Sequence, residues 1–253
     1  MLAATKFMME NINTAPAGTR PPFVVRAVRW LWRIAADRVY RNVMWLYFFK
    51  PNGTFQPFND TQHDRYPQIF HLVQSALGVE SRVKILSYGC STGDEVFSLR
   101  QYFPRALIKG IDINRANIAV CRDRLKKTFD ADIAFATARS TAGEPSGHYD
   151  AIFCMAVLRH GSLGLPGVTR CDHLIRFEEF AQTVADFERC LKPGGLLIIR
   201  HSNFRLCDAP AGKAFETIMR LPTDPKTPIF GPDNRLLPDR EYPDTAFRKK
   251  LSH

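Results

Sequence analysis

The sequence lacks any apolar run near the roughly 18 residues that a helix needs to cross a bilayer. It also lacks a charged-then-apolar secretory leader, and its six cysteines include no Cys-x-x-Cys pair. Cys171, Asp172 and His173 stand together, but no second cluster of metal-ligating residues accompanies them. These absences predict reduced cysteines, no metal site and a cytoplasmic location.

Acidic residues are scarce near the N-terminus, where the chain is strongly basic. From Arg20 to Lys50 there are seven cations and one anion, which accounts for +6 of the net charge of +10. Apolar residues recur at a period near 3.6 from Phe23 to about Phe49, with arginines on the other side, which predicts one long basic amphipathic helix. All three tryptophans lie in this helix.

Three partners suit such a helix, and the sequence leaves them open. Its apolar side can pack on its own domain or mediate self-association through residues 23–50. Alternatively, it can make a peripheral contact with the anionic inner surface of a membrane. Nucleic acid is a third partner for a basic face, although no specific nucleic-acid motif is present.

Residues 83–114 have the pattern of a buried strand, a glycine-bearing turn, a helix and a second buried strand. Gly89 and Gly93 allow a sharp turn and a close approach of the backbone to a ligand. The second strand ends at Asp112, twenty-three residues after Gly89. This spacing places a carboxylate against ribose hydroxyls in a parallel βαβ unit, so the stretch predicts a nucleoside-cofactor site.

The glycine turn also indicates which cofactor is bound. A dinucleotide site needs a third glycine so that the pyrophosphate lies on bare backbone, and the turn has none. Asp94 and Glu95 open the following helix, where they would repel a pyrophosphate but suit the cationic groups of S-adenosylmethionine (SAM). The alternative is a strand-turn-helix unit that binds no ligand.

The loop Gly89-Cys90-Ser91-Thr92-Gly93 resembles that of the class I SAM-dependent methyltransferases. With the two acids after it, the loop looks most like that of the CheR-type protein-glutamate methyltransferases. Two later motifs also match class I enzymes: the strand from Asp150 with its Val-Leu-x-His sequel, and the Leu-Lys-Pro-Gly-Gly-Leu-Leu-Ile run. The resemblance covers residues 83–200. It implies an α/β, Rossmann-like domain with a seven-stranded, mostly parallel sheet, helices on both faces and an N-terminal helical extension.

The resemblance implies SAM as the cofactor and assigns the residues that bind it. The glycine loop would hold the methionine end, Asp112 the ribose, and the region around 136–138 the adenine. Ser87 stands where many relatives carry an acid, so the contact to the amino group falls to Asp94 or Glu95. The expected cofactor-binding residues are Gly89, Cys90, Ser91, Thr92, Gly93, Asp94, Asp112, Ile113, Met155 and Ala156.

The chain is expected to have three parts. Residues 1–22 have no periodicity and are predicted to form a mobile tail. Residues 23–78 hold the basic helix and a segment that, by the resemblance, closes over the cofactor, with Phe58, Asn59 and Tyr66 as candidate lid residues. Residues 79–253 form the methyltransferase domain. Within it, Leu196 to Ile199 is expected to start the fifth strand.

The methyl acceptor is not identified by the sequence. CheR-type enzymes carry an Arg-Asn pair where this chain has Met155-Ala156, which argues against a glutamate acceptor, and the Asn/Asp-Pro-Pro-aromatic run of base-amine methylases is absent. His160 is a candidate general base, or else a loop residue that hydrogen-bonds the backbone. The favoured function is transfer to a small molecule or lipid. The alternatives are a protein (carboxyl or amine) or RNA acceptor, and a SAM-binding module without catalysis.

Overall fold

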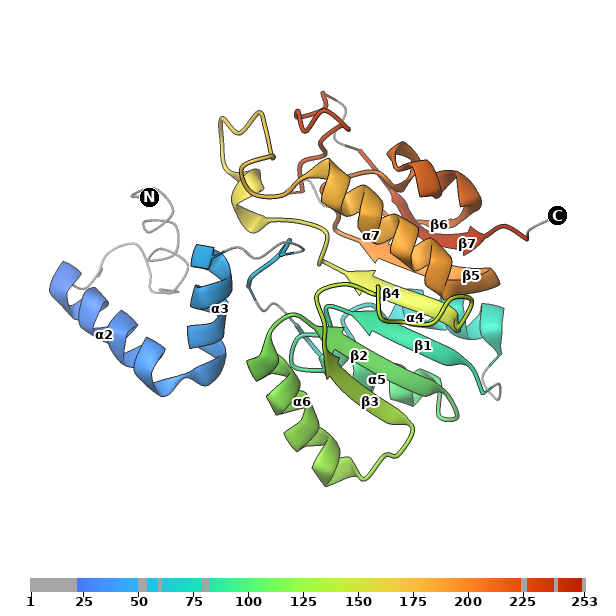
Figure 1. Cartoon of the computed structure of the whole chain (residues 1–253), viewed down its shortest axis with the longest axis horizontal. Coiled ribbons are helices and arrows are strands. Elements are labelled where there is room, and N and C mark those ends of the chain that lie inside the picture. Colours follow the sequence, from blue (N-terminus) through green and yellow to red (C-terminus); the bar gives the residue numbers. More distant parts are fainter. Residues whose placement is uncertain are drawn as a thin grey trace.

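The computed structural model describes residues 22–49, 54–58, 61–78, 82–223, 227–238 and 241–251. At its centre is a seven-stranded sheet in the order β3-β2-β1-β4-β5-β7-β6 (Figure 1). The first five strands run parallel, and β7 is antiparallel to both of its neighbours, β5 and β6. The strands are β1 (Lys84–Tyr88), β2 (Leu107–Asp112), β3 (Ile133–Thr137), β4 (Tyr149–Met155), β5 (Leu191–Arg200), β6 (Phe215–Arg220) and β7 (Asp244–Lys249).

Helices cover both faces of the sheet because alternate strand residues point to opposite sides. Ile85 and Phe153 pack with α4 (Pro67–Leu77), α5 (Asp94–Tyr102) and α6 (Arg115–Thr128). Their neighbours Leu86 and Ile152 pack instead with α7 (Phe177–Cys190). Short 3₁₀ helices follow β4 and β5, namely η1 (Gly161–Gly164), η2 (Leu206–Asp208) and η3 (Pro210–Ala214). The predicted Rossmann-like architecture is therefore confirmed.

The fifth strand begins earlier than the sequence suggested. It starts at Leu191, which pairs with Tyr149, and not at Leu196, which pairs with Ala151. Because four residues of β5 separate these two pairs and only one residue of β4 does, the Lys-Pro-Gly-Gly turn is a bulge inside the strand. A side chain at Gly195 would crowd the backbone oxygen of Lys192.

The N-terminal region contains two helices, so the prediction of one long helix is wrong. α2 (Phe23–Ala36) and α3 (Arg38–Phe49) are separated by Asp37, whose backbone is extended. The Asp37 carboxylate accepts a hydrogen bond from the Tyr40 backbone N–H at 2.9 Å and so caps α3. Arg41 donates to the backbone oxygens of Ile34 and Ala35, which closes the end of α2. Asp37, which the sequence placed on the charged side of one helix, is the N-terminal cap of a second helix.

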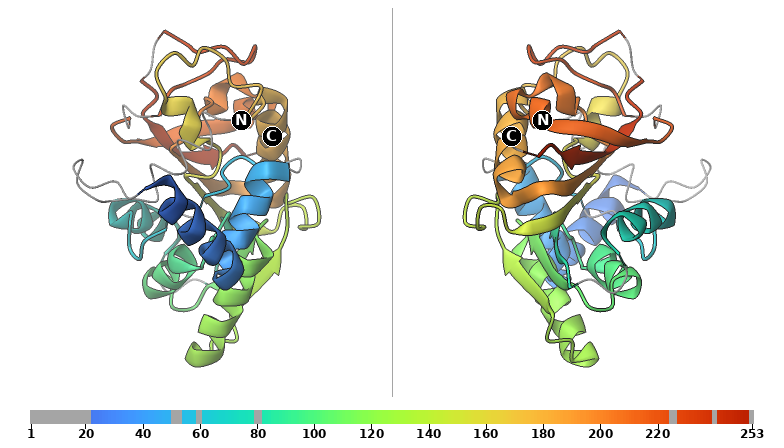
Figure 2. Two further views of the ribbon diagram at one scale, coloured as in Figure 1. Left: turned by 90° about the vertical axis from the view of Figure 1, so that its left-hand side faces the viewer. Right: turned by 90° about the vertical axis from the view of Figure 1, so that its right-hand side faces the viewer.

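The two helices form a V at one side of the sheet, beside α6, and Figure 2 shows them in front of the rest of the chain in its left view. α3 makes contact with α2 and with α6. Most of the predicted tail, residues 1–21, lies outside the described residues. No helix in the described part of the chain is both long and apolar enough to span a membrane.

Candidate cofactor-binding site

Two adjoining cavities lie at the carboxyl ends of the parallel strands, on either side of the backbone from Gly89 to Ser91. One, of about 70 Å³, receives residues from the ends of β1, β2, β3 and β4. The other, of about 40 Å³, lies toward α4 and α5, and Met155 lines both. The strand order reverses between β1 and β4, which is where open α/β sheets bind ligands.

The loop after β1 turns sharply and is anchored to β2. The backbone N–H groups of Gly89 and Cys90 both donate to the backbone oxygen of Ile111, at 2.8 and 3.0 Å. Gly89 has a φ of +72°, and a side chain there would overlap Val157. Ser91 has a φ of 51°, an unfavourable value for a residue with a side chain. The loop therefore needs glycine at position 89, and it stores backbone strain where it borders the cavities.

Asp112 ends β2 and holds the neighbouring loops in place. Its Oδ2 accepts from the Ser91 N–H at 2.9 Å. Its Oδ1 accepts from the Asn114 N–H at 2.7 Å and from the Asn117 side chain at 3.2 Å. Burial raises the pKa of Asp112, and these three donors oppose the shift. The carboxylate lines the larger cavity, as expected for a group that accepts hydrogen bonds from ribose.

The smaller cavity has its own carboxylate, Glu95, from the first turn of α5. Ser87 Oγ donates a hydrogen bond to Glu95 Oε1 at 2.6 Å. Burial raises the pKa of Glu95 to about 7, against the opposing effect of the Ser87 hydroxyl. Arg65 lines the same cavity, so a carboxylate and a guanidinium lie at one end of the site. This pair matches a ligand that carries both an ammonium and a carboxylate.

Three residues that line the larger cavity carry buried polar atoms with no hydrogen-bond partner among the described residues. They are Gln56 Oε1, Ser91 Oγ and Asn114 Nδ2. Buried polar groups normally have a partner, so acceptors and a donor left over in one cavity indicate a polar ligand. Together with Asp112, they suit a nucleoside.

The segment before α4 covers both cavities. Phe55 is only 1% exposed and, with the buried Pro57, closes the larger cavity from the side opposite the sheet. Leu46 of α3 also lines this cavity, and the Phe58 ring lies 5.6 Å from that of Tyr47 on α3. Tyr66, at the start of α4, lines the smaller cavity. The chain leading into the sheet is thus part of the wall of the site.

A family comparison agrees with this geometry. The sequence model of a family described as a methyltransferase domain matches residues 79–225, more than half of the chain. The chain belongs to that family. It therefore contains a methyltransferase domain. A search of curated proteins finds no match.

Solved structures similar to this chain include a cyclase and two methyltransferases. The [4+2]-cyclase SpnF is 18% identical, with a TM-score of 0.46, and the match covers 63% of this chain and 61% of that one. Phosphoethanolamine N-methyltransferase 2 from Haemonchus contortus is 14% identical, with a TM-score of 0.42 and coverage of 83% and 39%. Geranyl diphosphate C-methyltransferase from Streptomyces coelicolor A3(2) is 12% identical, with a TM-score of 0.39 and coverage of 53% and 44%. The methyltransferase therefore spans less than two thirds of the length of each of these chains, and their activities do not transfer to it at such low identity.

Seven of the ten residues predicted to bind the cofactor line a cavity of the methyltransferase. Thr92, Gly93 and Asp94 line neither one. The Asp94 carboxylate pairs with Arg124 at 2.7 Å, and Arg124 also donates to the backbone oxygen of Thr92. Of the seven, those at the larger cavity are Gly89, Ser91, Asp112, Ile113, Met155 and Ala156. Those at the smaller cavity are Gly89, Cys90, Ser91 and Met155.

The sequence did not identify several of the lining residues. Asn114 is one of them: its Oδ1 accepts from the N–H groups of Ala116 and Asn117, and its Nδ2 has no partner among the described residues. Gln56 and Arg65 come from the segment before α4, and no motif in the sequence marks either one as a ligand-binding residue. The candidate lid residues Phe58 and Tyr66 line the site, whereas Asn59 lies outside the described residues.

His160 lies away from both cavities and is 3% exposed. Its Nδ1 accepts from the Ser162 N–H at 3.2 Å, which caps η1, and its own N–H donates to Asn203 at 2.8 Å. These contacts favour the backbone-bonding role over that of a general base. Among the described residues that line the two cavities there is no histidine, and no cluster in the described chain could hold a metal ion.

Proposed function

We propose that this methyltransferase transfers the methyl group of SAM to a small molecule or a lipid. The observation that supports the proposal is the enclosure of the site. Phe55 and Leu46 line the larger cavity and are only 1% and 4% exposed. A folded protein or an RNA helix needs an open cleft at the reacting methyl group, whereas a small molecule or an extended lipid chain needs only a narrow one.

In this proposal, SAM would occupy both cavities, with a different part of the molecule in each. SAM supplies an electrophilic methyl group on a sulfonium. Asp112 and the unpartnered atoms of Gln56 and Asn114 would hold the adenosine in the larger cavity. Glu95 and Arg65 would hold the amino and carboxyl groups of the methionine in the smaller one. The sulfonium then lies near Met155, which borders both cavities.

Catalysis in this arrangement depends on position. The Gly89–Ser91 backbone and the strand-end residue Met155 fix the donor, and the covering segment excludes water from it. Among the described residues that line the cavities there is no histidine, and the carboxylates, Asp112 and Glu95, are both assigned to the cofactor. An acceptor that already carries a nucleophilic lone pair or anion suits this site, since in-line displacement then needs only alignment.

The acceptor pattern differs from that of the CheR-type enzymes, which the glycine loop resembles. Those enzymes carry an Arg-Asn pair after the fourth strand, and here Met155 and Ala156 occupy that position and line the larger cavity. Two apolar side chains cannot hold a glutamate carboxylate. This supports an acceptor other than a protein carboxyl group.

Transfer of a labelled methyl group tests the proposal. The full chain and methyl-labelled SAM are incubated with a cell extract, which is then separated into organic-soluble, small aqueous, protein and RNA fractions. Label is expected in the organic-soluble or small aqueous fraction and absent when Asp112→Ala replaces the wild type. Label in protein or RNA would contradict the proposed acceptor class. Binding of SAM without transfer to any fraction would favour the non-catalytic module.

A further inference from the structure

The α2–α3 hairpin (residues 22–49) exposes an unusual amount of apolar surface. Eight of the eleven exposed large hydrophobic side chains in the described part of the chain belong to it. Trp32 is 71% exposed and Phe49 is 69% exposed. The eight are Val24, Val25, Val28, Leu31, Trp32, Trp45, Phe48 and Phe49. A surface of this kind in one place indicates a contact with something apolar.

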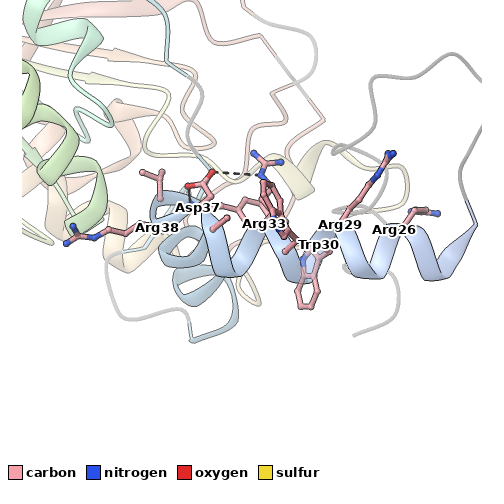
Figure 3. Close-up of a pocket in the computed structure, with 10 residues that line it drawn as sticks. Arg26, Arg29, Trp30, Arg33, Asp37 and Arg38 are labelled. Carbon is pink, nitrogen blue, oxygen red and sulfur yellow. Dashed lines mark hydrogen bonds and ion pairs between the residues drawn. The ribbon is translucent and has the colours of Figure 1, made fainter.

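The apolar and basic residues of α2 occupy opposite sides of the helix. Val24, Val28 and Leu31 follow one another at spacings of four and three, which places them on one side. Arg26, Arg29 and Arg33 follow the same spacings on the other side, and Figure 3 shows them projecting together from the helix. Helices with this division, and with tryptophan among the apolar residues, lie in the interface of a membrane.

A basic groove of about 780 Å³ runs along the arginine side of α2 and reaches the start of α3. Arg29 and Arg38 line it and are exposed (Figure 3). Arg33 lies over the Tyr40 ring at 4.3 Å and close to Asp37 at 4.0 Å, so it helps to hold the hairpin together. The described part of the hairpin carries five arginines and this one acid, a net charge of +4. Its complement is an anionic surface.

None of the residues that the structure describes packs over the exposed side of the hairpin. Tyr40, Val43, Met44 and Tyr47 form the buried side, together with Trp30, Ile34 and Phe58. If two copies of the chain met through this hairpin, each surface would carry a net charge of +4. Electrostatic repulsion between them would oppose the contact. Nucleic acid would match the arginines but not the exposed Trp32, Trp45 and Phe49. An anionic bilayer matches both kinds of side chain, because its phosphates can bind the arginines and its acyl chains, just below, can contact the apolar residues.

We infer that the α2–α3 hairpin docks the methyltransferase on an anionic phospholipid bilayer. Arginines bind lipid phosphates in a forked geometry, and the apolar side chains enter the boundary between head groups and acyl chains. Leu46 of the same hairpin lines the larger cavity, so the docked element is also a wall of the cofactor site. Docking does not depend on the proposed acceptor, because vesicle binding is measured without any methyl transfer.

Sedimentation with vesicles tests this inference on the full chain. Vesicles of equimolar phosphatidylcholine and phosphatidylglycerol are compared with vesicles of phosphatidylcholine alone. Arg29→Glu/Arg38→Glu removes exposed charge, and Leu31→Ser/Trp32→Ser removes exposed apolar surface. The controls are Lys126→Glu/Lys127→Glu, an equal change of charge at exposed positions of α6, and Phe129→Ser, whose side chain is 90% exposed.

The wild type is expected to sediment with the anionic vesicles and to lose this binding in about 1 M salt, where charges are screened within about 3 Å. Each hairpin variant should bind at least about tenfold more weakly, and the controls should stay within about twofold of the wild type. Calorimetry should give the same SAM affinity for all of these proteins, which shows that the variants are folded.

Four results would overturn the inference. The first is failure of the wild type to bind anionic vesicles, and the second is equal binding to both kinds of vesicle. The third is a dimer, seen by light scattering, that Leu31→Ser/Trp32→Ser dissociates while vesicles are not bound. The fourth is binding of inorganic phosphate at the arginines without binding to vesicles, which would mean that the ligand of the hairpin is a soluble anion and not a bilayer.

Discussion

Ser87 and Glu95 form a hydrogen-bonded pair in which the Ser87 hydroxyl donates to Glu95 Oε1 at 2.6 Å. Ser87 is a buried residue of β1, one position before its end, and Glu95 belongs to the first turn of α5. Many relatives that the sequence resembles carry an acid at the position of Ser87. In this chain the helix supplies the carboxylate, and the strand supplies the hydroxyl that orients it.

Glu95→Gln is expected to stabilise the ligand-free protein above neutral pH. The pKa of Glu95 is raised from 4.5 to about 7, so between these values the unfolded state loses its proton while the folded state keeps it. Ionisation therefore lowers the stability as pH rises, and the full cost is present above about pH 7. Glutamine keeps the oxygen that accepts from Ser87 and removes that cost. Urea unfolding should show a gain of about 2 kcal/mol at about pH 8 and almost none at about pH 4. A gain of the same size at both pH values would contradict the assigned pKa.

Gly89→Ala is expected to destabilise the protein by at least about 2 kcal/mol and to abolish SAM binding. The residue has a φ of +72°, and its new methyl group would overlap Val157. Gly143→Ala is the matched control, because nothing lies within 4 Å of its added methyl group. Thermal unfolding and calorimetry measure the two effects. The double variant Gly89→Ala/Val157→Ala should recover only part of the loss, since the backbone strain remains. Full recovery would show that φ at this position is unimportant.

Asp112→Ala and Asn117→Ala separate the two roles of the carboxylate. Asp112→Ala removes the acceptor of three hydrogen bonds and the group expected to hold the ribose. It should destabilise the protein by about 2 kcal/mol and weaken SAM binding at least about a hundredfold. Asn117→Ala removes one of the three donors and leaves the carboxylate in place. It should therefore cost stability with less than about a tenfold loss of SAM affinity. Equal losses of affinity in the two variants would mean that Asp112 acts only through the loop.

Phe58→Ala tests whether the segment before α4 works as a lid. The Phe58 ring packs on Tyr47 of α3 and lines the larger cavity. Its removal should loosen the cover, so SAM is expected to associate and dissociate about tenfold faster with a smaller change in affinity. Stopped-flow fluorescence measures both rates. Unchanged rates would show that the segment is a fixed wall of the site.

The sequence predicted those parts of the fold in which local patterns and tertiary structure agree. Residues 83–114 combine two apolar runs, two glycines and a strand-end acid, and each feature points to the same βαβ unit. The break at Asp37 was missed because the apolar period continues through it, and only the capping hydrogen bond to Tyr40 shows that a new helix begins.

The site was predicted only where its residues belong to regular elements. Asp112 and Met155 end strands, so their position at the carboxyl edge of the sheet follows from strand direction. Gln56 and Arg65 come from the segment before α4, and only the folded chain places them at the cavities. Asp94 and Glu95 were equivalent in the sequence. They differ in the structure because adjacent residues in a helix point in directions about 100° apart. Asp94 forms an ion pair with Arg124, whereas Glu95 accepts a hydrogen bond from Ser87.

Calorimetric titration of SAM into Glu95→Gln and Asp94→Asn tests the account most directly. The two variants make the same chemical change at adjacent residues, one at the smaller cavity and one paired with Arg124. Asp94→Asn should bind SAM within about threefold of the wild type. Glu95→Gln should bind at least about thirtyfold more weakly. The wild type and Asp94→Asn, which both keep Glu95, should lose affinity as the pH falls through about 7, since the protonated carboxyl no longer attracts an ammonium, and Glu95→Gln should not. A greater loss in Asp94→Asn than in Glu95→Gln, or no binding of SAM by the wild type, would contradict the proposed site.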